Sequence, residues 1–532
     1  MDGTRRVVLA DALPPEGTRI LGETDGLALE DRVGATRAQL RESLRGAAGL
    51  IVRSGTRVDA ELLDAADALE VIGRAGVGLD NIDLALATRR GVAVLNAPAG
   101  NTISTTELAF GLLLAAARRI PAADSSVRGG AWDRRGLAGM QLCGHTLGVV
   151  GMGRIGSEMA RRARAFGLGV LAYDPYVESD RAEELGVRLV ELEELLARSD
   201  FVTLHLPLTD ETQGLLDAAR IDRMRPGAIL VNAARGGLVD EAALAAALRS
   251  GHLAAAALDV FETEPLPAEH PLRDAPNLVL TPHIGASTPE AQARVAVEIA
   301  IAVRDALLEG DLRAAVNVTP LGAAERRRLQ PLLDLARRLG IVAAGSSGGS
   351  AERLEVRLGA REERGLRLTA AAAVTGFLRD VERGTLNLVN ALAVAEERAL
   401  EVVRSRHKPQ SGQAAWVEVT VRAGAGSTSV AGALRNDLTP GLVRVDGYPV
   451  NVTPRGILLF VRNRDVPGVI GRVGTRLGEA GVNIGEFHQA RDAKGGEALA
   501  VINLDEELST GTLEALRALP DVRGAWQVRL DV

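Results

Sequence analysis

The sequence has little of several residue types, and each shortage excludes a class of protein. Its 532 residues include one cysteine, Cys143, so neither an intramolecular disulfide nor a cysteine-based zinc site can form. Aromatic residues make up only 2% of the chain, which leaves alanine, valine and leucine to build the cores. The formal net charge is −7, which argues against a nucleic-acid-binding protein.

Long apolar runs are also missing. The longest, Leu108–Ala117, is interrupted by Gly111 and is too short to span a bilayer. The N-terminal residues contain no apolar segment of signal-peptide length. We therefore expect a cytoplasmic protein with no membrane partner. The length exceeds that of one hydrophobic core, so three or four domains are expected.

What the sequence does contain is an alternation of short apolar strands and helical segments. Residues 5–98 and 145–283 both repeat this βαβ pattern, and fully apolar strands favour parallel sheets covered by helices on both faces. The helix expected over 289–310 should pack back on the first domain and make it discontinuous. From about residue 455 the order is βαββαβ, which suggests a ferredoxin-like fold.

The expected fold class is therefore α/β, with two Rossmann-like doubly wound domains, an α+β intervening domain and a small ferredoxin-like domain. The expected boundaries are 1–98 with 285–315 for substrate binding, 99–284 for the dinucleotide, 316–452 for the intervening domain and 453–532 for the last domain.

The run GMGRIG at 151–156 fits the dinucleotide pattern G-x-G-x-x-G. An apolar strand precedes it, a helix follows it, and Asp174 ends the next strand. We expect Gly151 to form the tight turn, Gly153 to let the backbone approach a pyrophosphate, and Gly156 to allow close helix–strand packing. Asp174 would accept a hydrogen bond from the ribose 2′-hydroxyl, which favours NAD over NADP. A purely structural turn is the alternative.

Three residues in distinctive runs supply the chemistry of hydride transfer at a 2-hydroxy or 2-keto carbon. Arg235 lies in NAARGGLVDE, Glu264 in LDVFETEP and His283 in TPHIGAST. Imidazole can donate and accept a proton near neutrality, a carboxylate can orient it, and an arginine offers a bidentate fork to a substrate carboxylate. Taken singly, each could be a surface, turn or loop residue. All three follow apolar strands, which places them at the carboxyl edge of the sheet, where ligands bind.

These runs, with GMGRIG, resemble the D-isomer-specific 2-hydroxyacid dehydrogenases over residues 1–315. The resemblance implies an NAD-dependent enzyme in which Arg235 binds the substrate carboxylate and His283 is the acid/base paired with Glu264. Asp259 matches a further family acid with a structural or pH-tuning role. The expected cofactor-binding residues are Gly151, Gly153, Arg154, Ile155, Gly156, Asp174, Ala233 and Asp259.

Two runs in the first domain bear on the substrate. In GRAGVGLDNID (73–83), Gly76–Val77–Gly78 would present backbone N–H groups to a carboxylate, and Arg53 and Arg74 follow strands where a phosphate could lie. Ordinary surface charge is the alternative for both arginines. The runs resemble those of the 3-phosphoglycerate dehydrogenases, which implies that these arginines and one from WDRRG (132–136) meet a phosphate. The expected substrate-binding residues are Arg53, Ser54, Arg74, Gly76, Val77, Gly78, Asn101 and Arg134, with Arg135 as the alternative to Arg134.

Residues 464–484 resemble the ACT domain, a regulatory module that binds L-serine at a subunit interface in that family. The resemblance implies an effector site at Asp465 and Asn483, although Asn463 stands where a close relative type has an aromatic residue. The middle segment resembles the family's intervening domain. Together these features predict NAD-dependent oxidation of 3-phospho-D-glycerate to 3-phosphohydroxypyruvate, the first step of L-serine biosynthesis, by a serine-inhibited homotetramer without a metal. The alternatives are a glyoxylate or hydroxypyruvate reductase and a non-catalytic, dinucleotide-sensing corepressor.

Overall fold

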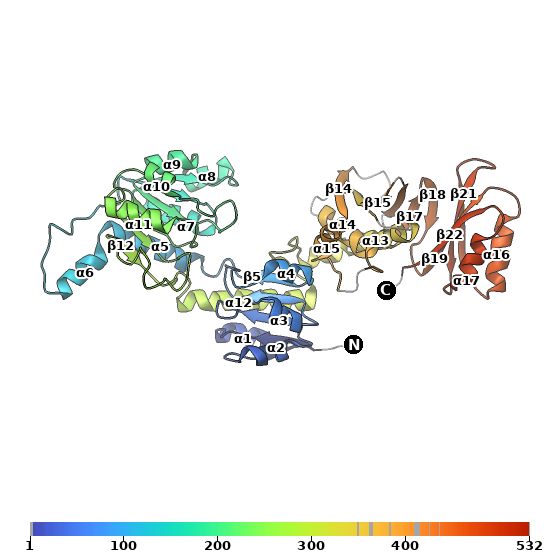
Figure 1. Cartoon of the computed structure of the whole chain (residues 1–532), viewed down its shortest axis with the longest axis horizontal. Helices are drawn as coiled ribbons and strands as arrows, with labels where there is room; N and C mark the ends of the chain where they lie inside the picture. The colour runs from blue at the N-terminus through green and yellow to red at the C-terminus, as the bar shows by residue number, and fades with distance from the viewer. Residues whose placement is uncertain are drawn as a thin grey trace. The chain divides into compact units, whose positions relative to one another are not determined.

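The computed structural model describes residues 4–347, 351–360, 365–381, 385–408, 415–424, 426–435 and 437–530 (Figure 1). The chain divides into two compact units. One comprises residues 1–13, 19–96 and 299–532, and the other residues 14–18 and 97–298. None of the described helices combines the length and apolar character needed for a bilayer span. The domain boundaries expected from the sequence stay predictions.

The first unit begins with a parallel five-stranded sheet in the order β2-β1-β3-β4-β5. Its elements are β1 (Arg5–Leu9), α1 (Pro15–Gly22), β2 (Leu27–Asp31), α2 (Arg37–Leu44), β3 (Gly49–Val52), α3 (Ala60–Ala65), β4 (Val71–Arg74), α4 (Leu84–Arg89) and β5 (Ala93–Asn96). Helix α12 (Pro289–Glu309) returns to this sheet, because a Cβ at Gly73 would lie only 2.5 Å from Val303 Cγ2. The expected return of this helix to the first domain is confirmed.

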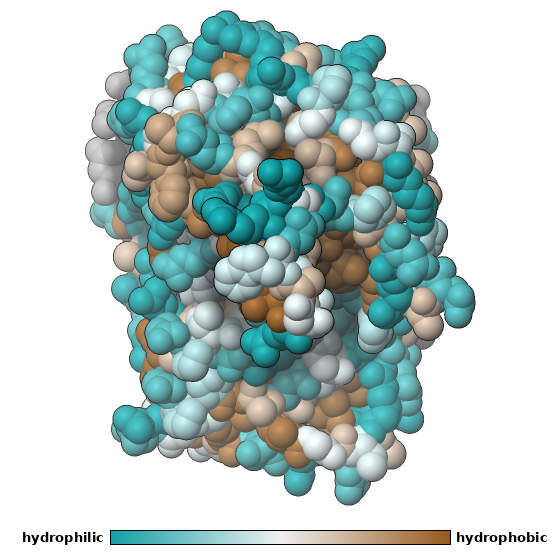
Figure 2. All heavy atoms as spheres, turned by 90° about the vertical axis from the view of Figure 1, so that its left-hand side faces the viewer, coloured by the Kyte–Doolittle hydropathy of each residue, from teal (hydrophilic) through white to brown (hydrophobic). Residues whose placement is uncertain are grey.

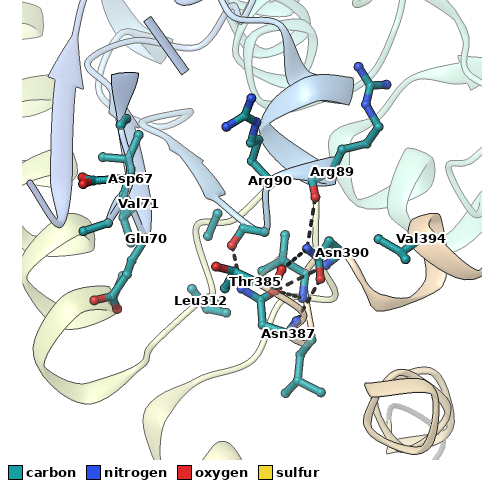
Figure 3. A pocket seen from close by; sticks show the side chains of 18 of the residues that line it. Asp67, Glu70, Val71, Arg89, Arg90, Leu312, Thr385, Asn387, Asn390 and Val394 are labelled. Atoms are coloured by element: carbon teal, nitrogen blue, oxygen red, sulfur yellow. Dashed lines mark hydrogen bonds between the residues drawn. The ribbon is translucent and has the colours of Figure 1, made fainter. Parts of the chain in front are cut away.

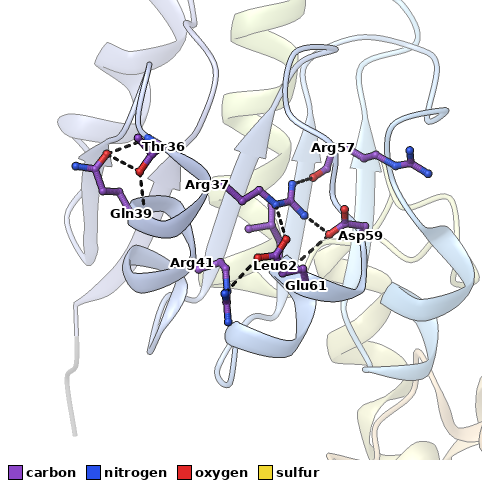
Figure 4. Close-up of polar contacts among 8 residues, drawn as sticks. All are labelled: Thr36, Arg37, Gln39, Arg41, Arg57, Asp59, Glu61 and Leu62. Carbon is purple, nitrogen blue, oxygen red and sulfur yellow. Dashed lines mark hydrogen bonds and ion pairs between the residues drawn. The ribbon is translucent and has the colours of Figure 1, made fainter.

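Local capping explains where two of these helices begin (Figure 4). Thr36 accepts from the backbone N–H of Gln39, and the Gln39 side chain accepts from the N–H of Thr36, which forms a capping box at the start of α2. Asp59 caps α3 by accepting from the Leu62 N–H. It also pairs with Arg37, which donates to Glu61 as well. These contacts tie the two helices together on one face of the sheet.

The second unit holds a parallel seven-stranded sheet in the order β12-β11-β10-β9-β6-β7-β8. Its elements are α5 (Thr102–Ala117), α6 (Ile120–Arg128), β6 (Thr146–Val150), α7 (Arg154–Ala165), β7 (Gly169–Tyr173), α8 (Ser179–Leu185), β8 (Arg188–Leu189), α9 (Leu192–Arg198), β9 (Phe201–Leu204), α10 (Ala218–Arg223), β10 (Ile229–Asn232), α11 (Glu241–Ser250), β11 (Ala255–Leu258) and β12 (Leu278–Leu280). Neighbouring residues Val149 and Val150 belong to different hydrophobic clusters, so helices cover both faces, as predicted for a doubly wound sheet.

The remainder of the first unit carries two more sheets. The six-stranded sheet and its helices comprise α13 (Ala323–Ser347), β13 (Arg353–Gly359), α14 (Gly365–Phe377), α15 (Ala391–Glu397), β14 (Glu401–His407), β15 (Ala415–Ala423), β16 (Gly426–Leu434), β17 (Pro440–Val445) and β18 (Tyr448–Val452). The last part comprises β19 (Ile457–Arg464), α16 (Val469–Glu479), β20 (Ile484–Arg491), β21 (Glu497–Leu504), α17 (Thr510–Arg517) and β22 (Val522–Arg529). Its antiparallel order β20-β21-β19-β22 confirms the predicted ferredoxin-like fold.

The two last parts of the chain share one hydrophobic core. Leu459 and Val461 of β19 face α16 and α17, whereas the alternate residues Leu458 and Phe460 join the cluster built on α13. A Cβ at Gly345, near the end of α13, would lie 2.4 Å from Val528 Cγ1 of β22. Helix α13 therefore covers the face of the ferredoxin-like sheet that its own helices leave open.

A pocket of about 700 Å³ lies within the first unit, where strands β4 and β5 begin (Figure 3). On one side the Asn387 side-chain amide donates to the Gly91 carbonyl at 2.9 Å, and that of Asn390 donates to the Arg89 carbonyl at 3.0 Å. These bonds hold the loop before α15 against the amino edge of the first sheet. Arg53 and Arg74 lie at the opposite edge of the sheet, where β3 and β4 end.

Candidate active site

The loop that carries Arg235 is shaped by a buried asparagine at the end of β10. Asn232 is 2% exposed; its amide donates to the Arg235 carbonyl at 2.8 Å, and its side-chain oxygen accepts from the Ala234 N–H at 3.0 Å. Ala233 between them is buried. Asn232 therefore satisfies backbone groups on both sides of the turn that carries the half-buried Arg235 at the carboxyl edge of the sheet.

Glu264 and His283 form the expected carboxylate–imidazole pair. His283 Nδ1 lies 2.8 Å from one Glu264 carboxylate oxygen, while the other oxygen accepts from the Phe261 N–H at 3.1 Å. In this arrangement the Nδ1–H donates to the carboxylate, and Nε2 is the nitrogen that can exchange a proton with a substrate. The His283 side chain is 50% exposed, and its φ of +53° holds the backbone in the sparsely populated left-handed region.

Asp259 supports the histidine loop from below. It is 1% exposed, and its carboxylate accepts from Thr281 Oγ1 at 2.6 Å and from the N–H groups of Ile284 and Gly285 at 2.9 Å each. These bonds fix the turn on both sides of His283. The sequence analysis grouped Asp259 with the cofactor-binding residues. That role stays a prediction; what the structure gives is a buried carboxylate that accepts hydrogen bonds from the His283 turn.

The glycine turn has the geometry that a dinucleotide requires. Gly151 has a φ of +95°, and a Cβ at Gly156 would lie 1.9 Å from the Gly151 carbonyl oxygen, so side chains are excluded at both positions. A Cβ at Gly153 would meet no atom within 4 Å, so this side of the turn is open at the start of α7. Asp174 accepts from the Met152 and Tyr176 N–H groups at 2.8 and 2.9 Å. Arg154 is exposed and Ile155 half-buried beside the turn. These residues fit NAD.

Sequence reasoning did not single out His205, which follows β9 at the same edge. Its backbone carbonyl would lie 2.7 Å from a Cβ at Gly151, and its ring Nε2 lies 3.0 Å from Thr203 Oγ1. Burial lowers the pKa of His205 to about 4, so the ring is neutral at physiological pH. The run FVTLHLP at 201–207 offered only a histidine after an apolar strand. The burial that sets its charge comes from elements distant in sequence.

Asn101 lies at the N-terminus of α5, next to the histidine loop. One turn further along, Thr105 Oγ1 donates to the Gly285 carbonyl at 3.2 Å. Asn101 Oδ1 and Thr102 Oγ1 are buried, and neither has a hydrogen-bond partner among the described residues. Since buried polar atoms are rarely left unpaired, this position suits the ligand contact expected for Asn101.

Arg53 and Arg74, which are expected to bind the substrate, both lie at the carboxyl edge of the first sheet. Arg53 follows β3, and its N–H donates to Asp11 at 2.6 Å, with the exposed Ser54 beside it. Arg74 ends β4, and its guanidinium folds over Gly76, where a Cβ would lie 1.5 Å from Arg74 Nη1.

The loop after Arg74 is set in place by the neighbouring strand. Gly76 has a φ of +151°, which favours glycine, and Val77 and Gly78 are half-buried. The Asn96 side chain, at the end of β5, donates to the Val77 carbonyl at 2.9 Å. Asn96 is a further residue that the sequence analysis missed. It fixes the loop whose N–H groups are expected to meet a carboxylate.

Arg134 lies on an arm of the second unit, residues 129–145, which connects α6 to β6. Apolar side chains are exposed at the end of α6, where Val127 is 55% exposed, and in the arm, where Trp132 is 81% exposed. Figure 2 faces the side on which α6 lies in Figure 1 and shows hydrophobic residues among hydrophilic ones there. Asp133 accepts from the N–H groups of Arg135 and Gly136. Within the described residues, no hydrogen bond or ion pair joins the exposed Arg134 to the other site residues.

Asp465 and Asn483 lie in the ferredoxin-like part, where each already has a partner. Asp465 accepts from Arg491 Nη1 at 2.8 Å, which lowers the pKa of this carboxyl, and from the Gly495 N–H at 3.2 Å. The Asn483 amide donates to Asp505 at 2.7 Å. Asp465 precedes α16 and Asn483 follows it, so the two lie at opposite ends of this helix.

Comparisons with known proteins place these observations in a family. Residues 110–285 match the D-isomer specific 2-hydroxyacid dehydrogenase NAD binding domain, 328–446 the D-3-phosphoglycerate dehydrogenase intervening domain, and 457–521 the ACT domain. The D-3-phosphoglycerate dehydrogenase of Methanocaldococcus jannaschii is 39% identical over 99% of this chain and 100% of its own length. That of Mycobacterium bovis is 43% identical over 97% of both chains. The chain belongs to the D-3-phosphoglycerate dehydrogenase family.

A solved structure agrees with this assignment. The D-lactate dehydrogenase of Aquifex aeolicus, complexed with NAD and lactic acid, is 31% identical and covers 58% of this chain and 97% of its own, with a TM-score of 0.52. The predicted family, fold class and NAD cofactor are confirmed, and the chain is an NAD-dependent oxidoreductase of the 2-hydroxyacid dehydrogenase type. Among the described residues no cluster of His, Cys, Asp or Glu could hold a metal.

Proposed function

We propose that the chain oxidises 3-phospho-D-glycerate to 3-phosphohydroxypyruvate with NAD, the first step of L-serine biosynthesis. The observation that carries this proposal is the near full-length similarity to relatives named D-3-phosphoglycerate dehydrogenase, together with two arginines at the carboxyl edge of the first sheet. A reductase of unphosphorylated keto acids would have no need of Arg53 and Arg74 at that edge. A corepressor would have no need of the Glu264–His283 pair.

In the proposed reaction, Arg235 binds the substrate carboxylate and polarises the C2 oxygen. His283 Nε2 takes the proton of the C2 hydroxyl while the hydride leaves C2, so that a C–H and an O–H bond break and the carbonyl forms. Glu264 keeps the imidazole oriented by accepting a hydrogen bond from its Nδ1–H. NAD, when bound, supplies the hydride acceptor.

Arg53 and Arg74 are proposed to bind the phosphate of the substrate, and Gly76–Val77–Gly78 to donate N–H groups to its carboxylate. Arg134 is proposed as a third phosphate ligand. Three ionised hydrogen-bond donors on a dianion would account for a preference for a phosphorylated acid over an unphosphorylated one.

The test is an initial-rate assay with 3-phosphoglycerate and NAD. Arg74→Ala should lower kcat/KM for 3-phosphoglycerate by about 10- to 100-fold, because it removes a charged hydrogen bond worth about 1.5–3 kcal/mol, while the KM for NAD stays unchanged. Arg41→Ala, an exposed arginine on α2 paired with Glu61, is the matched control and should leave both parameters unchanged.

Three outcomes would contradict the proposal. Equal kcat/KM values for wild type and Arg74→Ala would remove Arg74 from the phosphate site. A higher kcat/KM for hydroxypyruvate than for 3-phosphohydroxypyruvate would favour the reductase. No NADH formation at alkaline pH, with the product trapped, would favour the corepressor.

L-Serine is the proposed effector, bound between two copies of the ACT part. Asp465 and Asn483 stand at the two ends of α16, and an α-helix of eleven residues spans about 16 Å. One free amino acid is too small to touch both in a single chain, so Asp465 of one copy and Asn483 of another are proposed to hold it.

A homotetramer is the proposed assembly, in which two separate regions of the chain would each pair with a second copy. The apolar arm after α6 is one, and the ACT part is the other. Two different two-fold interfaces on one chain generate four copies with closed symmetry. A cytoplasmic location completes the proposal, since both NAD and a phosphorylated acid are metabolites of the cell interior.

A further inference from the structure

A buried carboxylate outside the expected catalytic set lies beside the loop that carries Glu264. Glu241 is the first residue of α11 and is 6% exposed. One carboxylate oxygen accepts from the Glu262 N–H at 2.7 Å, and the other lies 3.1 Å from Nε2 of His270. Desolvation raises the pKa of Glu241, against the opposing effects of the Glu262 N–H and His270. Burying such a group costs free energy unless it is paired and hydrogen-bonded, as Glu241 is.

His270 is oriented to serve this carboxylate. The Leu272 N–H donates to its Nδ1 at 3.4 Å, so Nδ1 is the acceptor nitrogen and Nε2 carries the proton that points to Glu241. The His270 side chain is 22% exposed. Glu241–His270 is thus a further carboxylate–imidazole pair, and it contacts the same loop that carries Glu264 of the Glu264–His283 pair.

The two loops of the site are also in direct backbone contact. Gly236, the residue after Arg235, approaches the other loop so closely that a Cβ there would lie 1.9 Å from the Phe261 carbonyl oxygen. The Phe261 N–H in turn donates to Glu264 at 3.1 Å. The short segment 261–264 is therefore held at two points, by the Glu241 carboxylate at Glu262 and by the Gly236 backbone at Phe261.

We propose that Glu241, oriented by His270, is a positioning residue that sets the place of the Glu264 carboxylate against His283. The bond from Glu262 to Glu241 lies two residues before Glu264, so its loss lets the segment that carries Glu264 move away from the imidazole. Displacements of about 1 Å in a catalytic group can lower a rate by about 100-fold. This inference rests on the proposed roles of Glu264 and His283.

The test is a double-mutant cycle in kcat, made with Glu241→Ala and Glu264→Gln in the full-length protein. Glu241→Ala should lower kcat about 10- to 100-fold with little change in the KM for NAD, because the glycine turn is untouched. In the Glu264→Gln background the same substitution should change kcat by less than about twofold, because residues that act through one another are not additive. Glu241→Gln keeps an acceptor for the Glu262 N–H and should restore part of the activity.

Asp311→Ala is the control, since Asp311 is also a buried carboxylate, 8% exposed, and lies outside the second unit. It should lower the melting temperature without changing kcat. Equal losses of kcat from Glu241→Ala in both backgrounds, or a lower melting temperature with unchanged kcat, would overturn the inference. If the wild type does not oxidise 3-phosphoglycerate, the proposed substrate fails, and the cycle is then run with a 2-keto acid that the wild type reduces.

Discussion

At the scale of single residues, the site depends on side chains that hydrogen-bond to the backbone of its loops. Asn232 shapes the turn before Arg235, Asp259 holds the turn around His283, and Asn96 holds the Val77 carbonyl. None of them is placed to take part in bond making. The position of a catalytic side chain depends on the loop that carries it. Substitution of these residues is therefore expected to lower kcat almost as much as substitution of Arg235, Glu264 or His283.

His205 makes stability depend on pH. Since burial lowers its pKa from 6.5 to about 4, the unfolded chain binds a proton between these values and the folded chain does not. The free energy of unfolding should therefore fall as the pH is lowered from about 6.5 to about 4. We expect the melting temperature of His205→Gln to depend less on pH in this window than that of the wild type. The exposed His407→Gln is the control, and equal slopes for His205→Gln and wild type would contradict the assignment.

At the scale of elements, α13 and α14 pack with their backbones in contact. A Cβ at Gly340 of α13 would lie 2.0 Å from the Ala373 carbonyl oxygen, and one at Gly376 of α14 would lie 1.9 Å from that of Arg337. The two glycines are thus reciprocal, and each helix fits the other only where a side chain is missing. The sequence of these helices is otherwise rich in alanine and leucine, which favours a helix without specifying its neighbour.

Gly376→Ala should destabilise this helix pair. The added methyl group meets backbone rather than a movable side chain, so overpacking costs about 1–3 kcal/mol, which exceeds the gain of about 1 kcal/mol in helix propensity. Gly471→Ala on α16 is the matched control, because a Cβ there meets no atom within 4 Å and only the propensity gain remains. Chemical denaturation measures the free energy of unfolding of both variants, and hydrogen exchange of the α13 and α14 amides measures the local stability of the helix pair. A Gly376→Ala protein as stable as wild type would show that the helices can separate freely.

At the scale of the whole molecule, the first unit links its regulatory parts to its first sheet by specific contacts. The ferredoxin-like sheet shares a core with α13, and the loop before α15 binds the first sheet through Asn387 and Asn390 (Figure 3). Those bonds reach the turn before β5, and β5 ends at Asn96, whose side chain donates to the Val77 carbonyl. A change in the ACT part therefore has a continuous set of packed contacts leading toward Val77.

L-Serine should act through this connection. At millimolar concentration it should lower the rate or raise the melting temperature of the wild type, because a ligand that binds only the folded assembly stabilises it. Asp465→Ala should abolish both effects, and D-serine is the control ligand. No change in rate or in melting temperature with L-serine would end the proposal of serine control.

Much of the chain could be predicted from its residues because the signals are local. The glycine turn at 151–156 needs small residues at fixed spacing, and Arg235, Glu264 and His283 each follow a strand that is a short apolar run. Parallel strands bring their carboxyl ends to the same edge of a sheet. The pattern of strands therefore predicts that Arg53 and Arg74 lie at the carboxyl edge of the first sheet. It likewise predicts that Arg235, Glu264 and His283 lie at that of the second. The family and its cofactor follow from the same motifs.

Other features were decided by tertiary structure alone, since they join residues far apart in the chain. Asp259 reads from sequence as one more acid after a strand, and only the fold buries it beneath residues 281–285. His205 and Glu241 likewise look ordinary until burial changes the proton affinity of each. Sequence by itself determined which chemistry the chain can perform, because reactive groups are residue identities. Tertiary structure decided which groups support that chemistry, because burial and hydrogen bonding depend on neighbours that sequence order does not reveal.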